Sequence, residues 1–477
     1  MRKKIFLLLL QLCLSFSAFA KTDNDLLFAK SSEKKLNNTS FEIEPKKVVL
    51  GGFTDETKLT SMTGTRFDFF GRSVSLSGNR ALIGARLDDE NGSNAGAAYI
   101  FEYDGVVWNE THKLIASDGE ASDLFGQSVS LSGNRAFISA IQDDDNNAVR
   151  SGSVYVFEYD GSEWIQMQKL TASDATSSDI FGLSISQSEN VVFIGSEGND
   201  KNANASGAVY VFELSGNIWQ ETQKITASDA TSGDQFGVSV NISGEQAIIG
   251  SLSDEFGTSS GSVYFFEFDG TNWIETQKLT PSDAERNGYF GFSVAISGNL
   301  AIVGSYNETN EIGFGTGSVY VLRKVGVNWE EIEKLIPDDL LDFSYFGYSV
   351  SLSGDFLLVG APGITGNTRQ VIGTAYLFRF NGTNWQELRK FSASDGFIGN
   401  QFGRQVSLSE NNVLIGAFLD NENGEDSGAA YIYLRGLGQS RAVAVNSFSK
   451  YGFILLIFLT VLIAYWKRVG LEKKKYY

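Results

Sequence analysis

Apolar and polar side chains alternate along most of this chain with a period of two, which predicts β-strands. In the stretch FGRSVSLSGNRALIGA, residues 70–85, one alternating run ends at a Ser-Gly-Asn turn and an apolar run follows it. A loop leads to GAAYIFEY at residues 96–103, and an Asp-Gly turn connects this run to VWNETHKLI at residues 107–115. An Asp-Gly pair between two apolar runs is a strong hairpin signal. The pattern therefore predicts a four-stranded antiparallel unit.

This unit recurs along the chain at intervals of 54 to 56 residues. A small sheet that is apolar on both faces needs a neighbour on each side, and a ring of such sheets supplies one. We therefore expect an all-β fold, a seven-bladed β-propeller of four-stranded antiparallel blades. The Phe-Gly pairs that open the seven copies begin at Phe70, Phe125, Phe181, Phe236, Phe290, Phe346 and Phe402.

The two ends of the array predict how the ring closes. The seventh copy reaches AAYIYLRG at residues 429–436 and stops before its fourth strand, while FTDETKLTS at residues 53–61 has the missing pattern. We expect this N-terminal strand to complete the last blade. A lysine recurs in every fourth strand. Edge lysines guard against pairing with other chains, and simple surface charge explains them equally well. These lysines are Lys58, Lys113, Lys169, Lys224, Lys278, Lys334 and Lys390.

With Phe-Gly openings, ALIGA at residues 81–85 and GAAYIF at residues 96–101, the chain resembles the FG-GAP repeat family, best known from the N-terminal propeller of integrin α subunits. The resemblance covers roughly residues 52–436 and implies the propeller fold. It implies much less about function, because propellers host many activities. Several integrin blades carry a calcium loop between the first and second strands, where this chain has only short turns. We therefore do not expect those calcium sites here.

Both ends of the chain predict export and membrane attachment. The first residues combine a basic start, an apolar middle and a small-residue ending, which is typical of a signal peptide. Near the C terminus, an uncharged apolar run precedes several cations, which predicts a transmembrane helix with a cytoplasmic tail. The expected organisation is a signal peptide at 1–20, a polar lead-in at 21–45, the propeller at 46–437, a linker at 438–450, a transmembrane helix at 451–466 and a basic cytoplasmic tail at 467–477.

The tail has a second resemblance, because VNSFSKYGFILL at residues 445–456 is similar to bacterial C-terminal sorting signals of the IPTL type. Asn446 and Tyr451 replace the proline and tryptophan of that pattern, and a plain membrane anchor explains the same residues. The only cysteine, Cys13, lies in the signal peptide, so the exported chain forms no disulfides. We expect a membrane-anchored protein of the cell envelope with its propeller outside the cytoplasm, at a bacterial surface or in the periplasm.

Charge and composition exclude several functions. The net charge is −19 for the whole chain and −26 for the part between the signal peptide and the tail, which contribute +3 and +4. Such a surface repels phosphates, so we expect no nucleic-acid partner. The only histidine, His112, occupies the position of Gln168, Gln223 and Gln277 in sister strands. This position makes His112 a surface strand residue by expectation. With no other histidine and no exported cysteine, Ser-His-Asp, Cys-His and histidine-zinc sites are excluded, and we expect no enzyme activity.

Acidic residues gather in the loops between the second and third strands, as in LDDENGSNAG at residues 87–96. These loops leave the propeller on the same face as the links between blades. Weak calcium binding is one interpretation, and the ordinary chemistry of solvated turns is the other. No other cofactor is expected. The candidate calcium ligands are Asp88, Asp89, Glu90, Asp143, Asp144, Asp145, Asp420 and Glu422.

A tryptophan recurs in six of the fourth strands, and two interpretations remain for it. The indoles either pack within the propeller, as Phe53 would in the seventh copy, or stack on sugars. We expect a non-catalytic protein of adhesion or scaffolding that presents a propeller face to a protein or cell-surface ligand; the alternative is a multivalent, lectin-like carbohydrate-binding propeller. The candidate sugar-stacking residues are Trp108, Trp164, Trp219, Trp273, Trp329 and Trp385.

Overall fold

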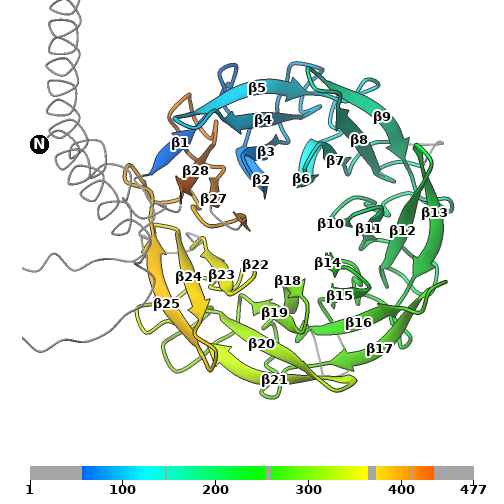
Figure 1. The fold of residues 1–477 in the computed structure, drawn as a ribbon, viewed down its shortest axis with the longest axis vertical. Helices are drawn as coiled ribbons and strands as arrows, with labels where there is room; N and C mark the ends of the chain where they lie inside the picture. Colours follow the sequence, from blue (N-terminus) through cyan, green and yellow to red (C-terminus); the bar gives the residue numbers. More distant parts are fainter. Residues whose placement is uncertain (1–55, 145–147, 254–258, 364–371, 410–411, 435–477) are drawn as a thin grey trace, which may run out of the picture. The chain divides into compact units, whose positions relative to one another are not determined.

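The structure is a computed structural model that describes residues 56–144, 148–253, 259–363, 372–409 and 412–434. Within these ranges the strands form seven four-stranded antiparallel sheets around a central axis (Figure 1). The first strand of each sheet lies nearest the axis and the fourth lies at the outer rim. The predicted seven-bladed propeller is confirmed.

The predicted signal peptide, lead-in, linker, transmembrane helix and tail lie outside the described residues. Among the residues that are described, no helix is long and apolar enough to cross a membrane.

Each blade follows the predicted meander. Blade 1 contains β2 (Phe70–Ser77), β3 (Arg80–Ala85), β4 (Ala97–Tyr103) and β5 (Trp108–Leu114). Blades 2 to 6 repeat this order with β6 (Phe125–Ser132), β7 (Arg135–Ala140), β8 (Ser153–Tyr159), β9 (Trp164–Leu170), β10 (Ile185–Ser188), β11 (Val191–Ser196), β12 (Ala208–Ser215), β13 (Ile218–Ile225), β14 (Ser239–Ser243), β15 (Gln246–Ser251), β16 (Ser262–Phe268), β17 (Trp273–Leu279), β18 (Phe290–Ser297), β19 (Leu300–Ser305), β20 (Ser318–Val325), β21 (Asn328–Leu335), β22 (Ser349–Ser353), β23 (Phe356–Ala361), β24 (Thr374–Phe380) and β25 (Trp385–Phe391).

Blade 7 closes the ring with a strand from the other end of the chain. It contains β26 (Val406–Leu408), β27 (Asn412–Ala417), β28 (Ala429–Leu434) and β1 (Thr57–Leu59). β1 pairs antiparallel with β28, as Figure 1 shows, and places Lys58 opposite Tyr431. The predicted closing strand is confirmed.

The Phe-Gly motif joins each blade to the one before it. Phe70 is buried and forms an isolated parallel bridge with Gly428 of blade 7. Gly71 has a φ of +86°, and a Cβ there would lie 2.2 Å from the backbone oxygen of Ala429. Only glycine allows this conformation and this close approach. The motif therefore recurs because every blade junction needs it.

The apolar core lies between the blades. Phe70 and Tyr99 of blade 1 pack in one cluster with Leu414 and Ile432 of blade 7. Each of the other apolar clusters likewise combines residues of two neighbouring blades. A blade cannot bury its two faces alone, and this explains why the ring must close.

Candidate functional site

The strand order gives the propeller two different faces. The loops between second and third strands and the links between blades leave the strands at one end, which we call the long-looped face. Tight turns between first and second and between third and fourth strands form the opposite face. Among the described residues, the predicted calcium ligands and the residues that flank the Phe-Gly motif belong to the long-looped face.

In blade 1, the recurring lysine reaches into the acidic loop. Lys113 lies opposite Tyr99 in the sheet, with its Nζ 5.3 Å from the centre of the tyrosine ring. Lys113 Nζ is 2.9 Å from Asp88 Oδ2, and the Tyr99 hydroxyl donates to the same oxygen at 2.7 Å. Asp88 is only 3% exposed. We call such a set of lysine, tyrosine and acid a lysine post.

Blades 2 and 7 repeat this post with the other buried calcium candidates. Lys169 Nζ lies 2.7 Å from Asp143 Oδ2, and Lys58 Nζ lies 2.9 Å from Asp420 Oδ1. Glu90 and Glu422 bind the ammonium groups of Lys113 and Lys58 from the same loops. Five of the eight predicted calcium ligands therefore pair with a lysine.

The remaining predicted ligands shape their loops or lie outside the described residues. Asp89 accepts a hydrogen bond from the backbone of Asn94 at 2.7 Å, and Asp144 accepts one from Arg150 at the same distance. Asp145 lies outside the described residues. Within the described ranges, no group of three or more acidic, histidine or cysteine side chains could hold a metal ion. Calcium binding stays a prediction.

Acids of the links between blades complete the posts in blades 2 to 7. In blade 3, Lys224 Nζ lies 2.8 Å from Asp174 Oδ2, and the Tyr210 hydroxyl donates to Oδ1 at 2.6 Å. Burial alone would raise the pKa of Asp174, but these hydrogen bonds lower it to about 2. The corresponding acids in the other blades are Asp118, Asp229, Asp283, Asp339 and Asp395.

The lysines are held in the charged state by the same contacts. Burial would lower the pKa of Lys113, but hydrogen bonds to Glu90 and Asp88 raise it above its ordinary value. Hydrogen bonds to Asp395, Glu422 and Asp420 likewise outweigh burial and raise the pKa of Lys58. The recurring lysines thus neutralise loop carboxylates and fasten the long-looped face to the outer strands.

The six tryptophans are buried between blades. Their exposed fractions lie between 2% and 8%. Trp329 stacks on Phe265 of the preceding blade with ring centres 4.5 Å apart, and Trp219 meets Phe137 of the preceding blade edge to face at 5.0 Å. Sugar stacking needs an exposed ring face. The burial of all six indoles favours the packing interpretation.

His112 occupies a position that links neighbouring blades. In blade 2, the side chain of Gln168 hydrogen-bonds both the backbone nitrogen and the backbone oxygen of Trp219 in blade 3, at 2.9 and 2.8 Å. His112 contacts blade 2 from the equivalent place, with Nε2 3.3 Å from the Ser162 oxygen. His112 therefore contacts the neighbouring blade, as Gln168 does in blade 2.

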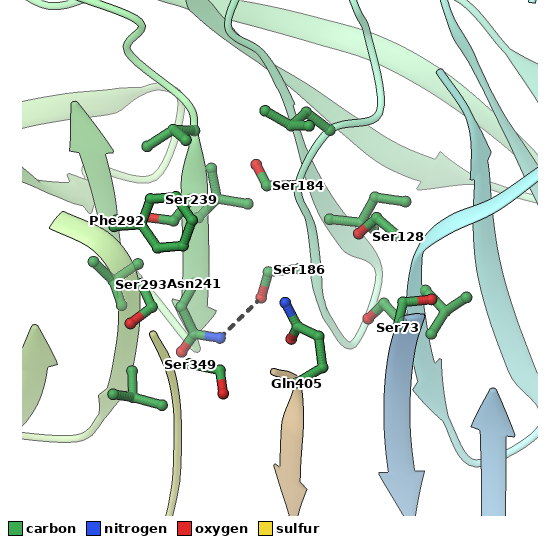
Figure 2. A pocket seen from close by; sticks show the side chains of 18 of the residues that line it. Ser73, Ser128, Ser184, Ser186, Ser239, Asn241, Phe292, Ser293, Ser349 and Gln405 are labelled. Atoms are coloured by element: carbon green, nitrogen blue, oxygen red, sulfur yellow. Dashed lines mark hydrogen bonds between the residues drawn. The ribbon is translucent and has the colours of Figure 1, made fainter. Parts of the chain in front are cut away.

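The central channel is lined by the innermost strands and holds a cavity of about 610 Å³. Figure 2 shows the serines that project from these strands. Ser73 donates to the Gly126 oxygen of the next blade at 2.8 Å, and Ser239 donates to the Gly291 oxygen at 2.7 Å. The Asn241 side chain donates to Ser186 at 3.3 Å (Figure 2). These polar side chains of the wall hold neighbouring blades together.

At the long-looped end of the channel, two positions per blade change from copy to copy. We call these residues the mouth. The first position directly follows Phe-Gly and carries Arg72, Gln127, Leu183, Val238, Phe292, Tyr348 and Arg404. The second directly follows the second strand and carries Arg86, Ile141, Glu197, Leu252, Tyr306, Pro362 and Phe418.

A strained turn presents the first mouth position. The residue before Phe-Gly has a left-handed backbone in all seven blades, with φ of +59° at Phe69 and +54° at Gln401. The Phe69 oxygen accepts a hydrogen bond from the backbone of Arg72 at 3.1 Å. Positive φ is unfavourable for such side chains and is retained where the surrounding structure requires it. The repeated turn therefore carries different side chains to the same place.

Three arginines form the basic sector of the mouth. The Arg404 guanidinium lies 4.7 Å from the centre of the Tyr348 ring, and Arg72 lies 5.7 Å from that of Phe418. Burial, followed by repulsion from Arg404 and Arg86, lowers the pKa of Arg72 to about 9. Burial and Arg404 also lower the pKa of Arg86. The three positive charges thus lie close enough to repel one another.

The part of the mouth next to the basic sector is aromatic. Tyr306 lies 5.1 Å from Tyr348, 4.5 Å from Phe292 and 5.6 Å from Tyr345, measured between ring centres. Phe343 continues this row 6.2 Å beyond Tyr345 and is exposed. Rings therefore run from the basic sector to the outer surface of the long-looped face.

Exposed apolar side chains surround the outer end of this row. The Phe343 backbone donates to the Phe314 oxygen at 2.7 Å, and Phe314 is 66% exposed. Leu341 lies in the same link and is exposed as well. We call Phe314, Leu341 and Phe343 the apolar patch.

The mouth residues were not predicted from the sequence. The predicted site residues are ones that recur, and in the structure most of them pair with lysines or pack between blades. The residues after Phe-Gly and after the second strand were readable as the variable neighbours of a constant motif. Comparison of the seven copies with one another would have found them.

Comparison with known proteins agrees with the repeat seen in the structure. No curated protein matches the chain. The model of a family described as FG-GAP repeat matches seven times, at residues 53–101, 108–157, 164–212, 219–266, 273–322, 329–378 and 385–433.

Proposed function

Because the chain belongs to the FG-GAP repeat family, we propose that it is a non-catalytic binding protein, of adhesion or scaffolding, whose long-looped face receives a protein ligand. One observation carries this proposal. The side chains that break the sevenfold repeat gather at the mouth, which adjoins the exposed apolar patch on the same face. Recurring side chains are committed to blade junctions and lysine posts, whereas the mouth is built differently in each blade.

The chemistry of this face suits a protein ligand. Aromatic and arginine side chains are enriched at the centres of protein interfaces. Phe314 and Phe343 are exposed beside a row of tyrosines that leads to the arginines. A protein loop could cover the apolar patch and reach the mouth at the same time.

The proposal includes a location outside the cytoplasm. The predicted signal peptide and the apolar run at residues 451–466 support a propeller that is exported and anchored in the membrane of a bacterial envelope. The long-looped face would then meet ligands of the surface or the periplasm.

A pair of double variants tests which face binds. The full-length protein is purified in detergent and cross-linked to envelope proteins of the organism that carries it. F314A/F343A removes two exposed rings of the long-looped face and should abolish cross-linking to the ligand. V325A/V327A removes two exposed side chains from the turn between β20 and β21, on the opposite face of the blade that carries Phe314, and should retain cross-linking.

The outcomes separate the proposal from its alternatives. A ligand that binds F314A/F343A as well as the original protein, or that is lost only in V325A/V327A, would contradict binding at the long-looped face. A glycan array probed with the same proteins tests the lectin-like alternative. Saturable binding of one glycan without a protein ligand would replace our proposal by that alternative.

A further inference from the structure

We propose that Arg72, Arg86 and Arg404 form an anion-binding site at the mouth, which receives a carboxylate of the protein ligand. This inference rests on the proposed function and adds the chemistry of the group that the ligand inserts. The site lies at the end of the channel, apart from the lysine posts.

The three guanidinium groups have few partners of their own. Within the described residues, none of them forms an ion pair. Arg86 Nη1 donates to Gln127 Oε1 at 3.0 Å, and Arg404 Nη1 donates to Gln401 Oε1 at 2.8 Å. The Nε atoms of all three arginines are buried without a hydrogen-bond partner. Buried donors without partners are rare and call for an explanation.

An anion is the simplest way to relieve this arrangement. Burial and mutual repulsion disfavour the charged form of Arg72. An arginine nevertheless keeps its proton in proteins, so the unfavourable energy is not relieved by deprotonation. A bound anion would accept hydrogen bonds from several N–H groups and would cancel the repulsion.

The rings hold the guanidinium groups in place. Arg404 lies over Tyr348 at 4.7 Å and over Phe418 at 5.1 Å, and Arg86 lies over Phe69 at 5.6 Å. A guanidinium stacked on a ring is held by its face, and its N–H edge can bind a carboxylate in two places. The site is therefore organised before the ligand arrives.

The surroundings favour a peptide carboxylate over a free inorganic anion. The aromatic row connects the arginines to the exposed Phe343, so the carrier of the anion can also bury apolar groups. Glu197 lines the same cavity as Arg72 and would repel a second negative charge. An acidic side chain or a C-terminal carboxylate beside an apolar residue has this chemistry.

Thermal unfolding of the full-length protein in detergent tests the site with small probes at constant ionic strength. The probes are N-acetylphenylalanine, its uncharged amide, acetate and inorganic phosphate. A ligand that binds only the folded state raises Tm in proportion to its affinity. We expect N-acetylphenylalanine to raise Tm most, acetate to raise it less, and the amide to have no effect.

Variants locate the effect. R72Q and R404Q should each weaken the apparent affinity for N-acetylphenylalanine at least tenfold. R80Q is the control, because Arg80 pairs with Glu102 at 2.7 Å beside the turn of the opposite face. R80Q should keep the full response. Without any probe, R72Q should unfold at the same or a higher temperature than the original protein, because it removes a repelling charge.

Three results would overturn the inference. The first is an equal response to the acid and its amide, and the second is an unchanged response in both R72Q and R404Q. The third is a lower Tm of R72Q without probe, which would make the arginine structural. If phosphate binds at least tenfold more tightly than N-acetylphenylalanine, the carboxylate proposal is wrong and the site binds a phosphate group instead. If F314A/F343A loses a protein ligand while the probes fail, the proposed function stands and only the anion site falls.

Discussion

Two sets of cations lie on the same face of the propeller, the lysines of the posts and the arginines of the mouth, and they differ in whether carboxylates neutralise them. Each lysine of a post lies against a tyrosine ring and within hydrogen-bonding distance of at least one carboxylate, as Lys113 does with Asp88. The arginines of the mouth also lie against rings, but within the described residues none of them forms an ion pair with a carboxylate. The lysines of the posts are neutralised within the protein, whereas the arginines of the mouth are not.

This difference follows the repeat. A contact that every blade junction needs recurs seven times, so its residues are selected for packing and neutrality. The mouth positions differ between blades, so they form an asymmetric surface around the axis. Unfavourable energy at such a site is commonly retained for function. The recurring residues thus serve the fold, and in our proposal the residues that differ between blades serve the ligand.

The largest expected effect is a difference in stability between loss of a buried, recurring ring and loss of an exposed ring. W329A should lower the free energy of unfolding by about 4 kcal/mol, because a buried indole between blades is lost. F314A should change it by less than about 0.5 kcal/mol, because its ring is exposed. Guanidinium chloride unfolding measures both. A W329A protein as stable as the original, with weakened sugar binding, would instead support the lectin-like interpretation.

The next effect compares two lysine posts. K334M should lower the free energy of unfolding by about 3 kcal/mol, because it leaves the buried Glu308 without its cation. K390M is the matched variant and should cost about 1 kcal/mol or less, because its partner Asp339 is largely exposed. Urea unfolding of the two variants gives the difference. Equal costs would show that the buried acid adds nothing to the post.

A smaller effect depends on pH. The pKa of Asp174 is lowered to about 2, so its folded form favours the charged state. The stabilisation is therefore present above about pH 4 and is lost as the pH falls through 2. D174N should be about 1 kcal/mol less stable at pH 7, and this difference should fall to less than half at pH 2. Urea unfolding at pH 7, 4 and 2 measures this, and a constant difference would contradict the post.

The smallest effect has the opposite sign and concerns the mouth. Burial raises the pKa of Glu197, so its charged form is disfavoured in the folded protein. The resulting destabilisation is present at neutral pH and disappears as the pH falls below the ordinary range of a glutamate. E197Q should raise the stability at pH 7 by less than about 1 kcal/mol and should have no effect at pH 3. Destabilisation by E197Q at pH 7 would place Glu197 in a satisfied contact instead.

Much of the fold could be predicted because its signals are local and repeated. The alternation within residues 70–85 predicts two strands, and the missing fourth strand of the last copy predicts the role of the segment before the first. The structure places β1 beside β28 as expected. The pairing of two segments far apart in sequence could be predicted, because the last copy lacks a fourth strand and the segment before the first copy has the pattern of one.

The candidate site was less accessible to the same reasoning. Asp88 and Lys113 are both visible in the sequence as an acidic loop residue and an edge lysine, but their contact depends on how a loop folds over the sheet. The tryptophans recur in either interpretation, and only packing against rings such as Phe265 shows that they are buried. Recurrence by itself does not distinguish a structural residue from a binding residue.

The sequence alone determined the strands, the blade number and the closure of the ring, because period-two alternation, turn residues and copy spacing act over short distances. Only the tertiary structure decided which charges are neutralised. Arg72 and Arg404 lie far apart in the chain and meet because the ring brings the first and last blades together. Coulombic repulsion and burial depend on distances in space, which residue order does not contain until the ring has closed.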